Sequence, residues 1–376
     1  MKLFDIQKYI KKNPSAGCEL FRSCNGFFTF AAVIPILNEN SNAENFFTNL
    51  MQAVNAAPNE KILIAAVVNC HKNSPADYRN DNFKLLERLR KNEFKIPNLA
   101  IFDHTSDGRT LTKGVGEARK IGMDHALTLF DFNDFDNAII CSLDADTEIE
   151  KDYFLKIRSG MEQDESSGVL TFNVQHRNDA EIPQTIKQYE AYMQSYRQGL
   201  EYANSPYAFF TVGSAFAVRA SAYIRSGGMR KLKAGEDFYF LQSAVKSTKV
   251  RHFPQVTVHP SARYSLRVPF GTGTALQAIS ENTREYHPFP TDAFEALKEI
   301  ISAASAENLQ SPKKYLNTIP QKFTDFFIQH DFEVDWVKVT ANMPLYQLPS
   351  AFLLHWFDGL KTLQFIKYAA QKINQP

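Results

Sequence analysis

The chain has 376 residues, of which 44% are apolar and 22% are charged, and its formal net charge at neutral pH is +1. This length allows two or three domains, and the composition is typical of a globular protein with a sizeable core. The near-zero net charge argues against a general nucleic-acid binder, so we expect no nucleic-acid partner.

Cysteine usage and the N-terminal residues bear on the cellular compartment. The cysteines show neither the paired spacing of a zinc site nor a disulfide framework; they are Cys18, Cys24, Cys70 and Cys141. We expect free thiols in the reducing cytoplasm. The first residues lack the apolar core of a signal peptide, and no stretch reaches the roughly 20 apolar residues that span a bilayer.

From residue 27 onward, apolar strands alternate with helical stretches. The predicted strands cover residues 27–37, 61–69, 99–104 and 137–146. Helices are expected to begin near Ser41 or Asn42, near residue 81 and near Gly114. Continuous apolar strands separated by helices predict an α/β fold with a mostly parallel sheet and helices on both faces. Such sheets bind ligands beyond the carboxyl ends of their strands.

The second half of the chain has a different pattern. A long helical stretch at 181–203 precedes a strand at 207–220, a helix that opens with GEDFYF, and a strand at 250–265. Beyond about residue 270 the periodicity is helical and is broken by prolines. We therefore expect a helical extension over residues 1–26, an α/β domain over 27–275 and a helical C-terminal region over 276–376.

Asp144 and Asp146 follow the fourth apolar strand in the sequence LDADTE. Residues i and i+2 of a strand project to the same side, so these two carboxylates would repel each other. Such a pair persists where a cation or a catalytic proton offsets the repulsion. The alternative, a solvated turn that leads into a helix cap, fits less well because the motif closes an apolar strand.

Four segments in this order resemble the GT-A glycosyltransferases, and family 2 in particular: VIPILNEN, GVGEARKIGMDHA, DAD and GEDFYF. The resemblance covers roughly residues 27–273. It implies a metal-dependent, inverting enzyme that moves a sugar from a nucleotide-diphosphate-sugar donor to a glycan, glycolipid or related acceptor. Mn²⁺ or Mg²⁺ would neutralise the diphosphate. Non-processive transfer is expected because the chain lacks a QxxRW motif and transmembrane helices.

The resemblance also implies residue roles. Asp146 is the expected metal ligand, with Asp144 directed toward the donor and His259 as a late ligand. Asp237 is the expected general base and Glu236 its helper. The expected donor-binding residues are Pro35, Asn38, Glu39, Asn69, Gly116, Arg119, Asp144, Arg263 and Arg267.

Several of these positions allow another interpretation. Asn69 stands where the family usually has a carboxylate that reads the donor base, so UDP- and GDP-sugars both remain candidates. Glu236 and Asp237 also suit the first turn of a helix, where acidic residues complement the dipole. Arg119 could lie on a solvated helix face, and His259 could be structural. GVGEARKIG departs from the dinucleotide fingerprint at its sixth position, which argues against a dehydrogenase.

The sequence leaves two alternative functions, and it does not decide the role of the C-terminal tail. A sugar-1-phosphate nucleotidyltransferase would have a Gly-rich basic loop after the first strand, where this chain has PILNENSNAEN. The other rival is a non-catalytic carbohydrate- or nucleotide-binding protein on a degenerate scaffold. A retaining mechanism is the alternative to inversion.

The aromatic tail with Lys361, Lys367 and Lys372 suits an acceptor-docking or peripheral membrane surface, or a packed helical cap.

Overall fold

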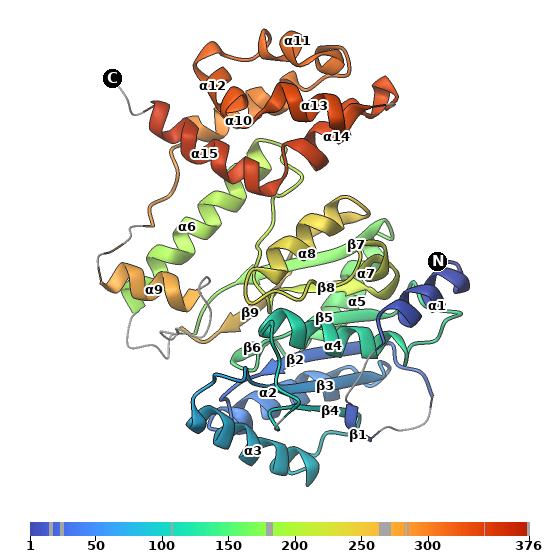
Figure 1. Cartoon of the computed structure of the whole chain (residues 1–376). Helices are drawn as coiled ribbons and strands as arrows, with labels where there is room; N and C mark the ends of the chain where they lie inside the picture. The colour runs from blue at the N-terminus through green and yellow to red at the C-terminus, as the bar shows by residue number, and fades with distance from the viewer. Residues whose placement is uncertain are drawn as a thin grey trace. The chain divides into compact units, whose positions relative to one another are not determined.

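The computed structural model describes residues 1–14, 18–22, 26–106, 108–177, 183–262, 272–281, 283, 286–341 and 343–373. The chain forms two compact units. The larger comprises Met1–Ile186 and Phe210–Arg284, and the smaller comprises Lys187–Phe209 and Glu285–Pro376. The larger unit is α/β and the smaller is helical (Figure 1). This confirms the predicted α/β class and the helical C-terminal region.

The larger unit contains a mixed sheet with nine strands among the described residues, in the order β1-β4-β3-β2-β5-β8-β7-β9-β6. The strands are β1 Cys18–Arg22, β2 Phe30–Ile36, β3 Ile62–Asn69, β4 Leu99–His104, β5 Ile139–Ser142, β6 Thr147–Ile149, β7 Ser167–Val174, β8 Phe216–Arg219 and β9 Lys249–Pro260. Parallel pairing joins β4, β3, β2 and β5, as expected from their apolar runs. Beyond β5 the neighbours are antiparallel, except that β7 and β9 are parallel.

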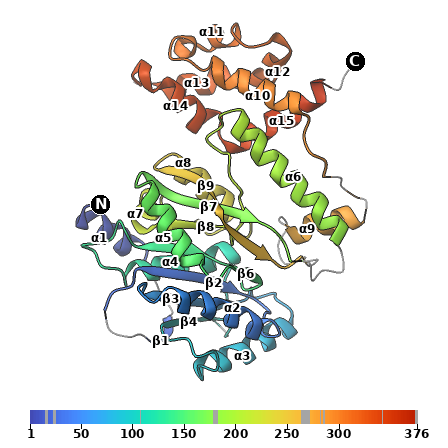
Figure 2. The ribbon, with the colours of Figure 1, turned by 180° about the vertical axis from the view of Figure 1, so that it is seen from behind.

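Helices cover both faces of this sheet. The helices of the larger unit are α1 Leu3–Lys12, α2 Ala43–Ala56, α3 Ala76–Arg90, α4 Val115–Leu127, α5 Tyr153–Gln163, α7 Ala220–Arg225, α8 Glu236–Val245 and α9 Thr272–Ser280. Figure 1 shows α4, α7 and α8 on one face, and Figure 2 shows α2 and α5 on the other. Because both faces are covered, β2 and β3 are buried along their whole lengths.

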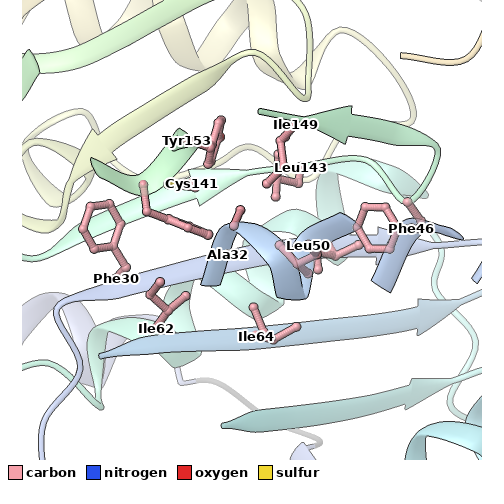
Figure 3. Close-up of a cluster of buried hydrophobic side chains, with 14 of the residues drawn as sticks. Phe30, Ala32, Phe46, Leu50, Ile62, Ile64, Cys141, Leu143, Ile149 and Tyr153 are labelled. Carbon is pink, nitrogen blue, oxygen red and sulfur yellow. The ribbon is translucent and has the colours of Figure 1, made fainter. Parts of the chain in front are cut away.

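The core between the sheet and α2, α3 and α5 uses every second residue of the parallel strands. Phe30, Ala32 and Ile34 of β2 belong to it, together with Phe46 and Leu50 of α2. Figure 3 shows Phe30, Ala32, Phe46 and Leu50 together with side chains of the neighbouring strands, such as Ile62, Ile64 and Cys141. Each large apolar side chain that is fully buried contributes roughly 1.5–3 kcal/mol to folding. This packed layer holds the strand ends of the parallel region in fixed register.

Several differences from the sequence prediction concern strands. The N-terminal extension was expected to be helical, but it also contributes β1, which pairs antiparallel with β4. The fourth predicted strand ends at Ser142 as β5, before the aspartates. The strand predicted over 207–220 is confined to β8. A strand needs a hydrogen-bonding neighbour, and local sequence does not reveal that neighbour.

The helices described in the smaller unit are α6 Pro183–Tyr202 from residue 187 onward, α10 Thr291–Ala303, α11 Pro312–Leu316, α12 Gln321–Gln329, α13 Phe332–Thr340, α14 Leu348–Ala351 and α15 Gly359–Ile373, with the short 3-10 helices η1 Asn308–Gln310 and η2 Leu345–Gln347 and the π-helix η3 Phe352–Trp356. The α6 helix was expected in the α/β domain. Its Tyr192 and Tyr196 rings instead pack against Phe289, within 5.7 and 5.9 Å between centroids.

The tail aromatics that suggested a docking or lipid-binding surface are buried in this smaller unit. Phe352 and Trp356 are stacked, with ring centroids 5.8 Å apart, and each is at most 1% exposed. Tyr315 and Phe327 lie in the same cluster. These aromatic residues of the tail therefore form a core, whereas Tyr346 is 76% exposed. None of the described helices is long and apolar enough to cross a membrane.

Candidate functional site

The candidate site lies where the strand order reverses. From β2 the chain moves outward to β3 and β4, then returns to place β5 on the other side of β2. Open α/β sheets bind ligands at such a point, beyond the carboxyl ends of the strands. The loop after β2 and the turn after β5 meet there, because the Asn42 Nδ2 atom donates a hydrogen bond to the Ala145 carbonyl at 2.9 Å.

Arg119 of α4 is the centre of a buried ion cluster at this edge. The residue is only 2% exposed, so the solvated helix face considered from the sequence is excluded. Its Nε donates to Glu236 Oε1 at 2.9 Å, its Nη1 to Ser142 Oγ at 2.7 Å and its Nη2 to Asp144 Oδ1 at 2.5 Å. One guanidinium thus joins α4, the end of β5 and the start of α8.

This cluster explains how Asp144 is accommodated. Because β5 ends at Ser142, Asp144 and Asp146 lie on the connection to β6 and not on a continuous strand. The cation that offsets the negative charge of Asp144 is Arg119. Burial alone lowers the pKa of Arg119, but Asp144 and Glu236 outweigh it and raise that pKa above its ordinary value. Arg119 therefore stays positively charged.

Gly213 is part of the cluster and was not identified from the sequence. A Cβ atom at this position would overlap the Arg119 guanidinium, so the backbone of Gly213 lies directly against it. Glycine inside an apolar stretch such as TVGSAF often marks a close approach of this kind. That signal was present in the sequence, but the sequence did not indicate which group approaches.

Asp237 lies beside the cluster, at the start of α8, and is partly buried. Burial raises its pKa to about 7, and the negative charge of Glu236 adds to this effect. The Phe238 N–H, 2.7 Å from Asp237 Oδ1, and Arg119 act in the opposite direction. A carboxyl group with a pKa near neutrality can accept and release a proton under physiological conditions. Glu236, in contrast, is held by Arg119.

Asp146 directly precedes β6, and His259 lies in β9, the strand that pairs with β6. The Ser261 N–H donates to the Asp146 carbonyl at 3.1 Å, and His259 is paired with Glu148 across β6 and β9. His259 Nδ1 lies 3.0 Å from the Gln175 carbonyl oxygen. Among the residues that the structure describes, no three His, Cys, Asp or Glu side chains form a metal-binding group. A Mg²⁺ or Mn²⁺ ion held by one or two carboxylates takes its other ligands from phosphate and water.

The remaining predicted donor residues lie on or near β2 and β3. Pro35 is buried in β2 opposite Val67, and Glu39 is 5% exposed. Asn38 has a positive φ of 56°. The Asn69 side-chain amide donates to the Ile36 and Val67 carbonyls, each at 3.1 Å, so its nitrogen serves the sheet. Arg263 and Arg267 lie outside the described residues.

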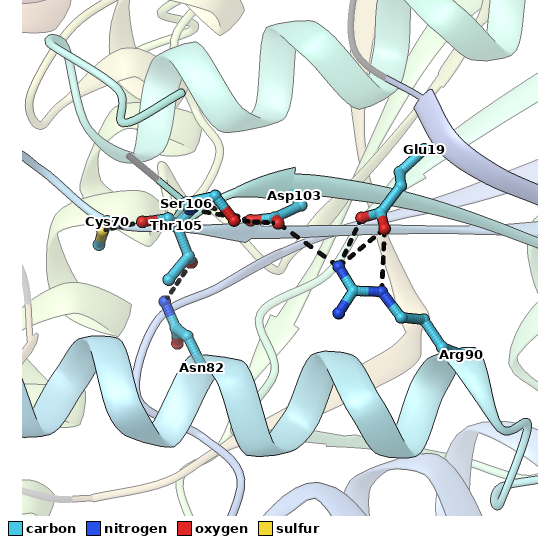
Figure 4. A network of polar contacts seen from close by, with 7 residues as sticks. All are labelled: Glu19, Cys70, Asn82, Arg90, Asp103, Thr105 and Ser106. Carbon is cyan, nitrogen blue, oxygen red and sulfur yellow. Dashed lines mark hydrogen bonds and ion pairs between the residues drawn. The ribbon is translucent and has the colours of Figure 1, made fainter. Parts of the chain in front are cut away.

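Asn82, on the buried face of α3, fixes the ends of three parallel strands and was not identified from the sequence. Its Oδ1 accepts from the Asn38 N–H, and its Nδ2 donates to the Asn69 carbonyl and to Thr105 Oγ1, each at 2.9 Å. Figure 4 shows that Asn82 belongs to one network with Asp103, because the Thr105 N–H donates to Asp103 Oδ1 at 2.8 Å. An asparagine at helical spacing (i, i+3, i+4 and i+7) from Leu85, Leu86 and Leu89 is the sequence signal that could have revealed it.

Gly116 holds the loop that leads to Asp237. Its N–H donates to the Leu232 carbonyl at 3.1 Å, and so serves this loop. A Cβ at Gly116 would lie 2.6 Å from the Leu232 oxygen and 2.7 Å from the Arg230 oxygen. The backbone of residues 230–232 can therefore approach α4 only because residue 116 is glycine.

Replacing Gly116 by alanine is expected to destabilise the protein by roughly 1–3 kcal/mol, because the 230–232 backbone must move away. Helix propensity alone would act in the opposite direction, by roughly 0.5–1 kcal/mol. The sign of the change in unfolding free energy, measured with urea, distinguishes the two effects. A more stable Gly116→Ala variant would show that the close approach is absent.

No known protein-family model matches this chain, and no curated protein matches it in sequence.

Proposed function

We propose that this protein is a metal-dependent, non-processive glycosyltransferase of the GT-A type, with motifs similar to family 2. It would transfer a sugar, with inversion, from a nucleotide-diphosphate donor to a glycan or lipid-linked acceptor. The observation that carries the proposal is the Arg119 cluster. It joins Asp144 of the DAD turn to Glu236 of the GED helix, at the point where an α/β sheet binds its ligands.

Each residue of the site has a separate role in the proposed reaction. Asp146 would hold Mn²⁺ or Mg²⁺, with Asp144 and His259 as further candidate ligands, and the metal when bound would neutralise charge on the departing diphosphate. Asp237 would accept the proton of the acceptor hydroxyl group, since its pKa of about 7 suits a base. Glu236 would hold Arg119 in place, because its carboxylate is engaged by the guanidinium. It would not act as a second base.

Thermal unfolding with a panel of UDP-, GDP- and dTDP-sugars in the presence of Mn²⁺ tests this proposal. A bound donor at a hundredfold excess over its dissociation constant stabilises the folded state by about 2.7 kcal/mol. We therefore expect one class of nucleotide sugar to raise the melting temperature by several degrees. A response to nucleoside triphosphates and sugar-1-phosphates instead would favour a nucleotidyltransferase. No response to any nucleotide would contradict both.

Donor binding is expected to require a divalent cation held through Asp146. Asp146→Asn keeps the side-chain shape but removes the charge that attracts the metal, so the affinity for UDP or GDP with Mn²⁺ should fall at least roughly tenfold. Titration calorimetry with and without EDTA measures this. Asp152→Asn, on the exposed start of α5, is the matched control and should bind as the unaltered protein does. Affinity that is insensitive to EDTA and to Asp146→Asn would exclude this metal role.

A further inference from the structure

The N-terminal helix α1 is fixed to the larger unit by one face. Ile6 is fully buried, and the Tyr9 hydroxyl donates to Asp124 Oδ1 of α4 at 3.0 Å. Tyr223 of α7 donates to the same oxygen at 3.0 Å, and Lys120 Nζ lies 2.8 Å from Asp124 Oδ2. Because Ile6 and Tyr9 are engaged in this way, α1 presents its opposite face to the surroundings.

That opposite face combines aromatic and basic side chains. Phe4, Lys8 and Lys11 are spaced at i, i+4 and i+7, which places them along one line of the helix. Phe4 is 70% exposed and Leu3 is 51% exposed. We call Phe4, Lys8, Lys11 and Lys12 the basic aromatic face, and the exposed Leu3 lies next to Phe4 in the first turn. Figure 1 shows α1 at the margin of the larger unit, beside α7.

We propose that the basic aromatic face binds an anionic lipid membrane surface. Asp5 is the one acidic residue in α1, whereas the whole chain has a net charge of only +1, so positive charge is concentrated locally here. Basic side chains gain from the potential of anionic headgroups, and large apolar side chains gain from burial at the acyl boundary. A phenylalanine and a leucine at the tip of a lysine-bearing helix supply both contributions. The site of this contact is distinct from the aromatic core of the smaller unit.

Vesicle co-sedimentation of the full chain tests this proposal. We expect binding to vesicles of phosphatidylcholine mixed with phosphatidylglycerol, weakening as salt is added, and little binding to phosphatidylcholine alone. Each basic residue near an anionic surface contributes roughly a fivefold factor, so Lys8→Glu with Lys11→Glu should weaken binding at least roughly 25-fold. Phe4→Ser should weaken it independently of salt. Lys8→Arg with Lys11→Arg should retain binding.

Matched controls lie on α3. Lys84→Glu with Lys91→Glu makes the same charge change at exposed positions, and Phe83→Ser removes another exposed phenylalanine. These α3 variants should bind the anionic vesicles as the unaltered chain does. Unchanged thermal unfolding of the α1 variants verifies that those variants fold. Absence of binding to the anionic vesicles at low salt would overturn the proposal. Equal losses in the α1 and α3 variants would do so as well. The test needs no sugar donor, so its outcome is separate from that of the proposed function.

Discussion

Replacing Arg119 by methionine should lower the free energy of unfolding by about 3–5 kcal/mol, because it leaves buried charge without its partner. Glu236 is buried and Asp144 is largely covered, and both face the guanidinium. The free energy of unfolding of Arg119→Lys should lie between those of the unaltered protein and Arg119→Met. An ammonium group keeps the charge but cannot make three directed contacts in one plane. Urea unfolding near neutral pH measures these differences.

The control for Arg119 is a surface pair. Lys249 and Asp164 are 2.7 Å apart, but the Lys249 side chain is more than half exposed. Lys249→Met should therefore cost less than about 1 kcal/mol. In the double variant Arg119→Met with Glu236→Gln, the second change removes one uncompensated charge, so the loss should be smaller than the sum of the single losses. An Arg119→Met variant within 1 kcal/mol of the unaltered protein would contradict the role of this cluster.

Asp237→Asn should reduce turnover by at least roughly a hundredfold while donor affinity is retained, because it removes proton acceptance and nearly preserves size. Since the pKa of Asp237 is about 7, the proposed transferase activity of the unaltered protein should gain kcat/KM as the pH rises through 7 and then level off. Turnover and donor binding are measured once a donor is identified. Loss of donor affinity to the same extent as turnover would make Asp237 a binding residue.

The raised pKa of Asp237 can also be tested without any donor. In the unfolded chain this carboxyl group ionises near its ordinary value of 3.8, whereas in the folded protein it stays protonated up to about 7. Its favourable contribution is complete below the lower value and is lost as the pH rises through the upper one. Asp237→Asn should therefore be more stable than the unaltered protein at about pH 8 and similar at about pH 4. A pH-independent difference would indicate that Asp237 ionises normally.

The parallel region of the fold could be predicted because β2, β3 and β4 are apolar along almost their whole length. That pattern arises when both faces of a sheet are covered. The strand β1 could not be predicted, because the hydrogen bonds that define it come from β4. In the same way, the short β8 depends on its neighbours β5 and β7.

In the candidate site, too, some residues could be predicted from the local sequence and others depend on distant parts of the chain. Asp144 and Asp237 were identified because acidic residues at strand ends and helix starts are visible in the sequence. The link between Asp144 and Glu236 was not predicted, because the sequence does not reveal that Arg119 is buried or that its guanidinium reaches both the end of β5 and the start of α8. Gly213 and Asn82 belong to the same class, since their roles depend on groups distant in the chain. The engaged amide of Asn69 is visible only once β2 and β3 are paired.

The order in which the two units are encoded has a consequence for synthesis of the protein on the ribosome. The smaller unit takes α6 from residues 187–209 and its other helices from 285 onward, with the last part of the larger unit encoded between them. The nascent α6 therefore emerges well before Phe289 and Phe294, the rings that cover its tyrosines. Until then its aromatic side is open to chaperones and to other nascent chains. A chain that stops after the larger unit would keep this side uncovered, so a soluble fragment should also omit α6.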